Sequence, residues 1–443
     1  MNESSYQEAL NHLYSLTHSG IKLGLKNTSR LLKHFGNPQL KTRTIHIAGT
    51  NGKGSTAAIT ESILRTSGYK VGLYTSPHLL DFRERIQINR KMIKKQQTVE
   101  LITRIKSAVE KLKIPITFFE FGTVLAFLYF YEQNTDINVI EVGLGGRLDA
   151  TNLCHAEISI ITSISRDHTQ YLGEGLKQIA FEKASIIKES GTVFAHIPNE
   201  ELFEVVNDLA VKNSADLFRL GVDFKIDSNA GNAGKNSFNF KWGDQKLNNL
   251  ILPLAGRFQR DNAGLALSAC LKLKQSGLNI EENHLRKGLA TVAWEGRLET
   301  VSSQPTVVLD CAHNEESVRN MTTALRENFQ FTRCFIVLGL MQDKNIDAVI
   351  KILSQFGDHF SLVSVNPPRG EAPEKLAEKL SIYNKPTQIF GTVSNALQAV
   401  KQVANQNDLV CITGSIFLVA IAKKLLNDEN TFFNSGDTLH SDK

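Results

Sequence analysis

A glycine-rich turn near the start of the chain has the composition of an anion-binding loop. Residues 45–56 read IHIAGTNGKGST, in which a predicted strand leads into three glycines, Lys53 and a predicted helix. Glycines let backbone N–H groups converge on an anion, the helix dipole favours negative charge, and a lysine can reach β- and γ-phosphates. The loop departs from GxxxxGK[ST], because Ile47 replaces the first glycine and Gly54 separates Lys53 from Ser55. A phosphate site is predicted, and a glycine-rich turn without a ligand is the alternative.

Two polar positions at predicted strand ends could hold a metal ion. Glu141 ends the apolar run 137–142 and precedes a glycine-rich stretch, GLGGRLDATN. A carboxylate at the carboxyl end of a parallel strand faces the ligand crevice, so Glu141 can hold Mg²⁺ there. A solvent-exposed strand end is the alternative, and the adjacent glycines favour the metal. Asp167 and His168 follow the run 157–163. Because Mg²⁺ prefers oxygen, the residue types alone favour a structural hydrogen bond for His168.

Lys183 falls on the apolar face of a predicted helix, 173–189. The residues that share this face at helical spacing are Leu176, Ile179, Ala180 and Ile187. A lysine on such a stripe is unfavourable unless it is paired or modified. It either extends along the edge of the stripe to solvent or projects into an active site.

A second polar cluster, DCAHN, begins at Asp310 directly after the predicted strand TVVLD. An acid, a histidine and an amide at a strand end indicate a crevice, although Asp310 or Asn314 could instead cap a helix. Arg297 lies in a predicted hinge, where it could clamp phosphate oxygens as domains close or could be a surface arginine. Ser415 follows the last predicted strand at a turn into a helix, with or without a ligand.

The elements around these residues alternate between strand and helix, which predicts an α/β fold with two doubly wound domains. Predicted strands are 43–48, 70–75, 137–142, 157–163, 306–310, 333–339, 359–365 and 408–413. Predicted helices are 53–67, 98–113, 120–132, 173–189 and 258–276. A hairpin is expected within 222–250. The expected domains are 1–295 and 296–426, and the polar segment 427–443 is expected to be a disordered tail.

The composition is that of a soluble globular protein, with 443 residues, 42% hydrophobic and 21% charged. A net charge of +5 suits small anionic ligands but is too diffuse to indicate nucleic acid. The five cysteines are scattered without a CxxC pair, which favours free thiols in a reducing cytosol. No signal peptide or membrane span is recognised, so we expect a cytoplasmic protein, and we expect a monomer.

A series of motifs in a fixed order resembles the folylpolyglutamate synthase/dihydrofolate synthase family of the Mur ligase superfamily, over about residues 20–425. The motifs are GTNGKGS (49–55), TSPHLLDFRERI (75–86), FFEFGT (118–123), EVGLGGRLDATN (141–152), DHTQYLG (167–173), IAFEKASIIK (179–188), GRFQRDNAGLAL (256–267), GRLE (296–299), DCAHN (310–314) and ITGS (412–415). The resemblance implies a P-loop-type ATPase domain with a parallel sheet, a smaller Rossmann-like C-terminal domain, and an active site between them.

The resemblance also implies roles for individual residues. Catalytic roles fall to Lys53, Lys183 and His313, with Lys183 carbamylated so that it becomes an anion near Mg²⁺. The implied Mg²⁺ ligands are Ser76, Glu141 and His168, which reverses the preference for His168 reached from its chemistry. The implied ATP contacts are Gly49, Thr50, Asn51, Gly52, Lys53, Gly54, Ser55, Asn262, Arg297, Asp310 and His313, with Asn262 near the base. The implied substrate contacts are Ser76, Pro77, His78, Phe82, Arg83, Arg85 and Ser415. This chain has Ser185 and Cys311 where the family usually has glycine.

The implied reaction is an ATP-dependent ligation. ATP phosphorylates a bound carboxylate, and the amino group of L-glutamate attacks the acyl phosphate. The expected substrates are dihydropteroate, reduced folates or both, and we favour both. Three alternatives remain: a UDP-muramoyl-type Mur ligase, a P-loop NTPase switch or motor, and a nucleotide-binding module without activity. The TSPHLLDFRERI loop and the lack of an extra N-terminal domain argue against the first, and intact Lys53 and Glu141 argue against the last.

Overall fold

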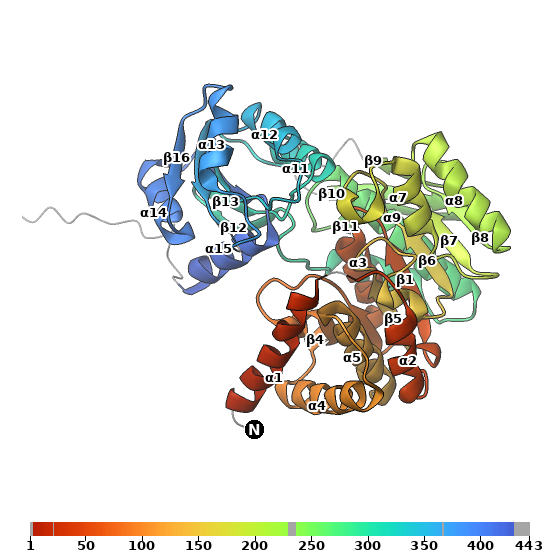
Figure 1. Cartoon of the computed structure of the whole chain (residues 1–443). Helices are drawn as coiled ribbons and strands as arrows, with labels where there is room; N and C mark the ends of the chain where they lie inside the picture. The colour runs from red at the N-terminus through yellow and green to blue at the C-terminus, as the bar shows by residue number, and fades with distance from the viewer. Residues whose placement is uncertain (1–2, 21, 229–235, 366, 429–443) are drawn as a thin grey trace, which may run out of the picture. The chain divides into compact units, whose positions relative to one another are not determined.

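The computed structural model describes residues 3–20, 22–228, 236–365 and 367–428, which form two compact units (Figure 1). The N-terminal unit comprises Met1–Pro253 and Phe258–Ala293, and the C-terminal unit comprises Leu254–Arg257 and Trp294–Lys443. Each unit has its own mainly parallel sheet covered by helices, so the predicted pair of α/β units is confirmed. Of the predicted tail, 429–443 lies outside the described residues, whereas 427 and 428 end a helix.

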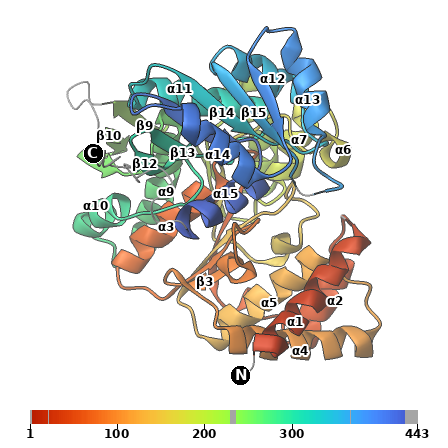
Figure 2. The same cartoon turned by 90° about the vertical axis from the view of Figure 1, so that its left-hand side faces the viewer.

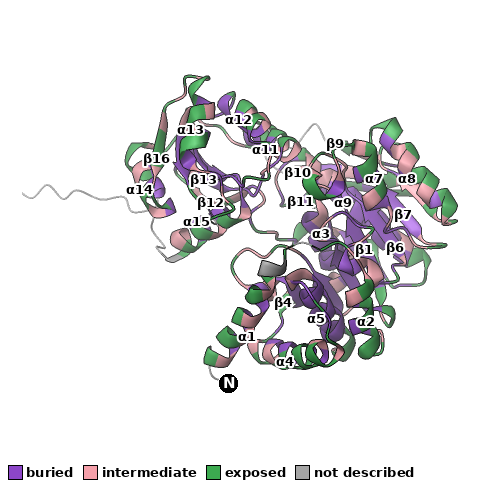
Figure 3. Ribbon diagram, viewed as in Figure 1, coloured by how far each residue is buried: buried purple, intermediate pink, exposed green. Residues whose placement is uncertain are grey.

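The sheet of the N-terminal unit has β1 at its centre. Among the described residues it is eight-stranded, in the order β4-β3-β2-β5-β1-β6-β7-β8, and the β2–β3 and β3–β4 pairs are antiparallel. The strands are β1 (Arg43–Ala48), β2 (Val71–Tyr74), β3 (Ile86–Ile88), β4 (Lys91–Met92), β5 (Ile137–Glu141), β6 (Ile158–Ile161), β7 (Thr192–Ala195) and β8 (Asp216–Arg219). The central strands are rich in isoleucine and valine and are buried on both faces, as parallel strands covered by helices require (Figure 3).

Helices cover the sheet of this unit, and α5 shows how one of them is buried. The helices are α1 (Glu3–Ser15), α2 (Lys26–His34), α3 (Lys53–Thr66), α4 (Lys95–Leu112), α5 (Phe118–Glu132), α6 (Thr169–Leu172), α7 (Leu176–Ala184), α8 (Glu200–Lys212), α9 (Arg257–Gln275) and α10 (Glu282–Ala290). Helix α5 is apolar around its whole circumference, so it is buried among α1, α2 and α4. Its start is fixed by a capping box, in which Thr117 and Glu120 each bond the other's backbone N–H.

A small antiparallel sheet lies where a hairpin was predicted. Within the described residues it has three strands, β9 (Phe224–Ser228), β10 (Asn236–Trp242) and β11 (Gln245–Leu252), in the order β11-β10-β9. Trp242 of β10 packs edge-on against Phe194 and Phe218, with ring centroids 5.2 and 5.4 Å away. These aromatic contacts tie the small sheet to strands β7 and β8 of the large one.

The C-terminal unit repeats the doubly wound plan (Figure 2). Its sheet, as far as the chain is described, is six-stranded in the order β12-β13-β17-β14-β15-β16, with β12 antiparallel. Its strands are β12 (Glu299–Ser303), β13 (Thr306–Leu309), β14 (Cys334–Leu338), β15 (His359–Val363), β16 (Thr387–Phe390) and β17 (Leu409–Thr413). Its helices are α11 (Glu315–Asn328), α12 (Ile346–Ser354), α13 (Pro373–Ser381), α14 (Val393–Val403) and α15 (Ile416–Asp428).

The predicted helix 173–189 is wrong in its extent. Helix α7 ends at Ala184, and Ile187 lies in the turn that follows, so it does not share a helical face with Lys183. The Ser185 hydroxyl donates to the Phe181 carbonyl at 2.7 Å, and the backbone N–H of Ile187 donates to Ala184, three residues back. The helix therefore tightens and stops at a serine followed by β-branched residues.

Two smaller expectations concern cysteines and membranes. The five cysteines are free and buried, as predicted. No helix in the described ranges has the length and apolar character needed to cross a bilayer.

The close approach of α10 to α3 gives a stability prediction. A Cβ atom added at Gly288 would lie 2.5 Å from the Ile63 Cα atom, so backbone would have to move. We expect Gly288→Ala to cost about 2 kcal/mol, because overpacking against backbone cannot relax cheaply. Gly122→Ala is the control: it is also helical, but its new Cβ would meet the Tyr74 hydroxyl at an ordinary 3.5 Å. In urea unfolding, the midpoint should fall for Gly288→Ala and stay at the wild-type value for Gly122→Ala. Equal midpoints for the two variants would contradict the predicted overpacking.

Candidate active site

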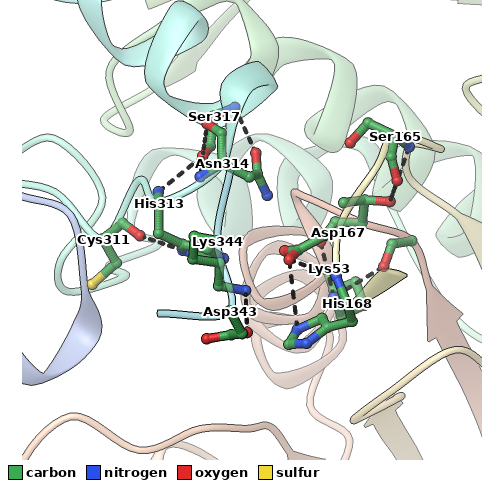
Figure 4. Close-up of polar contacts among 12 residues, drawn as sticks. Lys53, Ser165, Asp167, His168, Cys311, His313, Asn314, Ser317, Asp343 and Lys344 are labelled. Carbon is green, nitrogen blue, oxygen red and sulfur yellow. Dashed lines mark hydrogen bonds and ion pairs between the residues drawn. The ribbon is translucent and has the colours of Figure 1, made fainter. Parts of the chain in front are cut away.

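The predicted phosphate loop connects β1 to α3 and packs against the segment after β6. Gly52 forms the helix start with a left-handed backbone, φ 86°, and α3 begins at Lys53. The Thr50 N–H donates to the Ser163 carbonyl at 2.9 Å, and the Asn51 N–H donates to the Ser163 hydroxyl at 3.0 Å. Thr50 and Ser165 also exchange hydrogen bonds of 3.0 Å through the Thr50 hydroxyl (Figure 4). The loop is therefore held in shape by protein contacts.

The glycines of this loop are required by close packing. A Cβ at Gly49 would lie 1.9 Å from the Thr162 hydroxyl oxygen, and one at Gly52 would lie 2.4 Å from Asn262 Oδ1. Asn262 comes from α9 and donates its amide to Gln259 at 2.9 Å. The structure thus places Asn262, predicted as a nucleotide contact, beside the loop, and its predicted place near the base stays a prediction.

Two lysines converge on the backbone of the loop. Lys53 Nζ donates to the carbonyls of Gly49 and Thr50 at 3.0 Å each, and Lys183 Nζ donates to the Gly49 carbonyl at 2.9 Å. Lys183 is 4% exposed, so the alternative in which it extends to solvent is wrong. Its ammonium projects from α7 toward the loop at the end of β1. The two ammonium groups therefore put positive charge beside the start of α3, where the helix dipole also favours anions.

Glu141 is the candidate metal ligand with the best-defined environment. It ends β5, which pairs with β1 and β2, and is 5% exposed, so the exposed-terminus alternative is wrong. Its Oε2 atom accepts the Ser76 N–H at 2.9 Å, which joins two predicted ligands. Carboxylate and hydroxyl oxygens are ligands that Mg²⁺ prefers, so the residue types of Glu141 and Ser76 suit such an ion, and their role as metal ligands stays a prediction.

His168 sits in a left-handed backbone conformation, φ 52°, at the start of α6. Its N–H donates to Asp167 Oδ1 at 2.8 Å, and its Nε2 lies 4.0 Å from the same oxygen (Figure 4). The ring is 37% exposed. Throughout the described ranges, no group of three or more His, Cys, Asp or Glu residues is arranged to hold a metal ion. A metal role for His168 therefore stays a prediction.

The loop 75–86 is organised by two carboxylates. Glu84 accepts the backbone N–H groups of Leu79, Leu80 and Asp81 at 2.6–2.8 Å. Asp81 caps the short 3₁₀ helix Phe82–Arg85 and binds the Arg83 guanidinium in a bidentate pair, with a shortest distance of 2.7 Å. Phe82 is 1% exposed and belongs to the hydrophobic core. In this structure, Arg83 is paired and Phe82 supports the loop from beneath.

His78 and Arg85, two predicted substrate contacts, bind one another. Arg85 Nε donates to His78 Nδ1 at 2.8 Å, and the buried guanidinium lies 5.1 Å from the Phe118 ring centroid. Burial and the Arg85 charge lower the pKa of His78 to about 4. The imidazole is therefore a neutral acceptor at neutral pH.

The DCAHN cluster of the C-terminal unit follows β13. Asp310 is buried, its oxygens accept the N–H groups of Leu298 and Ala312 at 2.8 Å each, and burial raises its pKa. Asn314 and Ser317 form the capping box of α11, so the capping alternative holds for Asn314 and fails for Asp310. His313 Nδ1 lies 2.8 Å from the Cys311 carbonyl, which can only accept, so Nδ1 carries a proton (Figure 4).

Arg297 and Ser415 occupy different settings in the same unit. Arg297 is half-buried, so it is not a free surface arginine, and its Nη1 donates to the Gly296 carbonyl at 2.9 Å. Ser415 is buried and accepts the Leu418 N–H at 3.1 Å, which caps α15. Ser415 therefore has a structural task whatever else it binds.

Some residues that build the site were missed in the sequence. Thr162, Ser163 and Ser165 brace the phosphate loop, and the Thr162 hydroxyl donates to the Asn51 carbonyl at 2.6 Å. A buried relay joins His46 of β1 to Thr151 at 2.8 Å, and Thr151 in turn binds Asp149. The sequence signals that could have identified these residues were small hydroxyl residues after a buried strand and a histidine within a buried strand.

Comparison with known proteins covers nearly the whole chain. Residues 47–270 match the Mur ligase middle domain, and residues 296–416 match the glutamate ligase domain of Mur ligases. The dihydrofolate synthase/folylpolyglutamate synthase of Bacillus subtilis is 33% identical over 96% of this chain and 99% of its own length.

Solved structures give the same result. E. coli FolC in complex with DHPP and ADP is similar with a TM-score of 0.87 and 32% identity, over 95% of this chain and 98% of that one. A bifunctional folylpolyglutamate synthase/dihydrofolate synthase with Mn, AMPPNP and L-glutamate bound is similar with a TM-score of 0.85 and 31% identity, over the same shares.

The His78 environment yields a pH prediction. Because its pKa falls from 6.5 to about 4 on folding, the unfolded chain takes up a proton between these values and the folded chain does not. The free energy of unfolding should therefore decrease as the pH falls from 6.5 towards 4. Carbon-13 NMR of labelled histidine should give a His78 midpoint near 4, and Arg85→Gln should raise it. A midpoint near 6.5 would contradict the buried, Arg85-bound state.

Proposed function

Because this chain belongs to the dihydrofolate synthase/folylpolyglutamate synthase family of Mur ligases, we propose that it joins L-glutamate to dihydropteroate and to reduced folates at the expense of ATP. Both activities are proposed, since the relatives include chains named for both. In this proposal, residues 1–295 form the ATP-binding domain and 296–426 the second ligase domain.

The observation that carries the proposal is the braced loop at the end of β1, with two lysines on its backbone. Lys53 and Lys183 both donate to the Gly49 carbonyl, at 3.0 and 2.9 Å, beside the start of α3. A loop that is already ordered binds a triphosphate without reorganising, and the fixed positive charge of Lys53 stabilises the oxygens of the transferring phosphoryl group. We propose that residues 49–55 bind the ATP phosphates.

The reaction requires a carboxylate, a phosphoryl donor and an amine, but no nucleophilic side chain. ATP's γ-phosphate passes to the carboxylate of the pteroate or folate, and the glutamate amine displaces phosphate from the acyl phosphate. This chain's residues orient the partners and keep water from the acyl phosphate. Ser76, Glu141 and His168 are the proposed ligands of Mg²⁺, which neutralises phosphate charge when bound. Metal ions accompany AMPPNP in a relative's structure.

The remaining predicted residues take roles consistent with their surroundings. We propose that Asn262, Arg297 and Asp310 contact the nucleotide, with Asp310 also fixing the backbone of the segment that carries Arg297. His313 donates from Nδ1 to the Cys311 carbonyl, which fixes the orientation of the ring, and we propose that this ring contacts the nucleotide. Ser76, Pro77, His78, Phe82, Arg83, Arg85 and Ser415 are the proposed contacts or supports of the pterin-bearing substrate and glutamate.

We further propose that Lys183 is carbamylated in the active enzyme. Lys183 is 4% exposed, and its nitrogen lies 2.9 Å from a backbone carbonyl. After the ammonium has lost a proton, the amine nitrogen would form a bond to the carbon of CO₂ and release a second proton, so that a cation becomes a carbamate anion. The resulting carbamate oxygens would be suitable partners for Mg²⁺ or for its water ligands.

A product assay tests the proposed function. Purified protein receives ATP, Mg²⁺ and L-glutamate with dihydropteroate, and in a second reaction with tetrahydrofolate. We expect amide product, ADP and phosphate in equal amounts, and no product when ATP or glutamate is left out. Product from a UDP-muramoyl acceptor instead would assign a cell-wall ligase. ATP hydrolysis that is independent of acid and amine would indicate a switch or motor, and the proposal would then be wrong.

The Lys183 proposal has its own test. Lys183→Ala should reduce kcat by at least about 10²-fold while ATP still binds, because the carbamate that would partner Mg²⁺ or its water ligands is lost. Lys177→Ala, an exposed lysine on the same helix, is the matched control and should be fully active. In protein equilibrated with ¹³C-bicarbonate, a carbamate carbon signal should be present in wild type and absent from Lys183→Ala. Full activity of Lys183→Ala would remove this residue from the site.

A further inference from the structure

Lys423 is a buried lysine of α15 that binds the acids on either side of Arg297. Its Nζ lies 2.9 Å from Glu295 Oε2 and 2.6 Å from Glu299 Oε1, so one ammonium bridges two carboxylates. Lys423 is 7% exposed, and a charge buried to this degree persists only when it is paired. The two glutamates flank the three residues of which Arg297 is the middle one.

The backbone on both sides of Arg297 is left-handed, with φ 66° at Gly296 and φ 47° at Leu298. Glycine accepts this conformation, whereas leucine adopts it only when other contacts hold it. The Leu298 N–H donates to Asp310 at 2.8 Å, and the Gly296 N–H donates to Glu299 Oε2 at 2.8 Å. Arg297 is therefore presented by a turn that two carboxylates hold in place.

Glu299 connects Lys423 to that turn. One of its oxygens binds the Lys423 ammonium, and the other accepts the Gly296 N–H. If the ammonium were removed, the Glu299 carboxylate would lose its fixed orientation and the turn would lose one of its hydrogen bonds. Two neighbouring acids without a counter-charge would also attract the Arg297 guanidinium, which competes with any phosphate ligand.

We propose that Lys423 is a positioning residue, which holds the Glu299 carboxylate and neutralises both acids so that the turn keeps Arg297 in place to contact the phosphates of ATP. The inference rests on the proposed function, in which Arg297 contacts nucleotide. It assigns Lys423 no contact with substrate, and its effect on the reaction passes through Arg297.

The alternative is that Lys423 merely stabilises the C-terminal unit, and a double-mutant cycle separates the two. We expect Lys423→Met to raise the KM for ATP about tenfold, because a small displacement of a phosphate-binding group is costly. The KM for L-glutamate should change less than about twofold, and Lys423→Arg should restore most of the ATP affinity. In the Arg297→Ala background, Lys423→Met should have less than about a twofold further effect, because the residue through which it acts is gone.

Arg333→Met is the matched control for lost stability. It removes an ion pair of 2.6 Å with buried Asp408 in the same unit and leaves residues 295–299 untouched. It should lower Tm without raising the KM for ATP. Glu299→Gln, which keeps the side-chain shape but loses the charge paired with Lys423, should reproduce the Lys423→Met effect and replaces that variant if it does not fold.

If Lys423→Met raised the KM for ATP by the same factor with and without Arg297, the inference would be overturned. A raised KM for ATP in Arg333→Met would overturn it too. Failure of the proposed function is a separate outcome, in which wild type makes no ATP-dependent glutamate adduct. Arg297→Ala that raises the KM for ATP, beside Lys423→Met with the wild-type value, would contradict this inference alone.

Discussion

The hydrogen-bonded contact between residues 49–52 and 162–165 is the constraint on which the site depends. A loop of small residues has many conformations, and fixing it costs conformational entropy that binding would otherwise have to supply. Here the Thr50 and Asn51 N–H groups are bound by Ser163, and Thr162 and Asn262 leave room at Gly49 and Gly52 for a hydrogen atom only. That entropy cost is met during folding, so an incoming anion meets an ordered loop.

The strand order explains why this contact can form. Strand β1 lies between β5 and β6, and Ile47 is in register with Glu141 on one side and Ile160 on the other. All three strands are parallel, so the segments that follow them emerge at the same edge of the sheet. Residues far apart in the chain therefore meet there, as at the crevice of other open α/β sheets. Helix α7 then carries Lys183 to the same edge, where its ammonium reaches Gly49.

The sequence predicted the strands and the helix start that depend on neighbouring residues, and it missed features that depend on contacts between distant segments. Apolar β-branched runs predicted β1, β5 and β6, and the glycine–lysine turn predicted the start of α3, because those signals lie within a few residues. The bracing role of Ser163 was not predictable, since nothing near it shows that Thr50 and Asn51 lie opposite. The end of α7 was missed because a serine that bonds its preceding turn is compatible with either continuation or termination of a helix. The buried state of Lys183 was left open for a related reason, since its partner is the carbonyl of Gly49, which every residue type provides.

One device recurs in the loops that follow the strands: a buried or half-buried carboxylate accepts backbone N–H groups of a turn. Glu84 does so for 79–81, Asp310 for Leu298 and Ala312, and Glu141 for Ser76. Charged acceptors bind N–H groups more strongly than neutral ones, but their burial costs solvation that an apolar loop would not lose. Burial raises the pKa of Asp310, which shows that cost. A fold selected for stability alone would use fewer such groups, so their concentration at strand ends indicates that stability is given up for fixed geometry. In the proposed role of Lys423, a buried cation likewise gives up solvation to fix one turn, because it neutralises the two acids beside that turn.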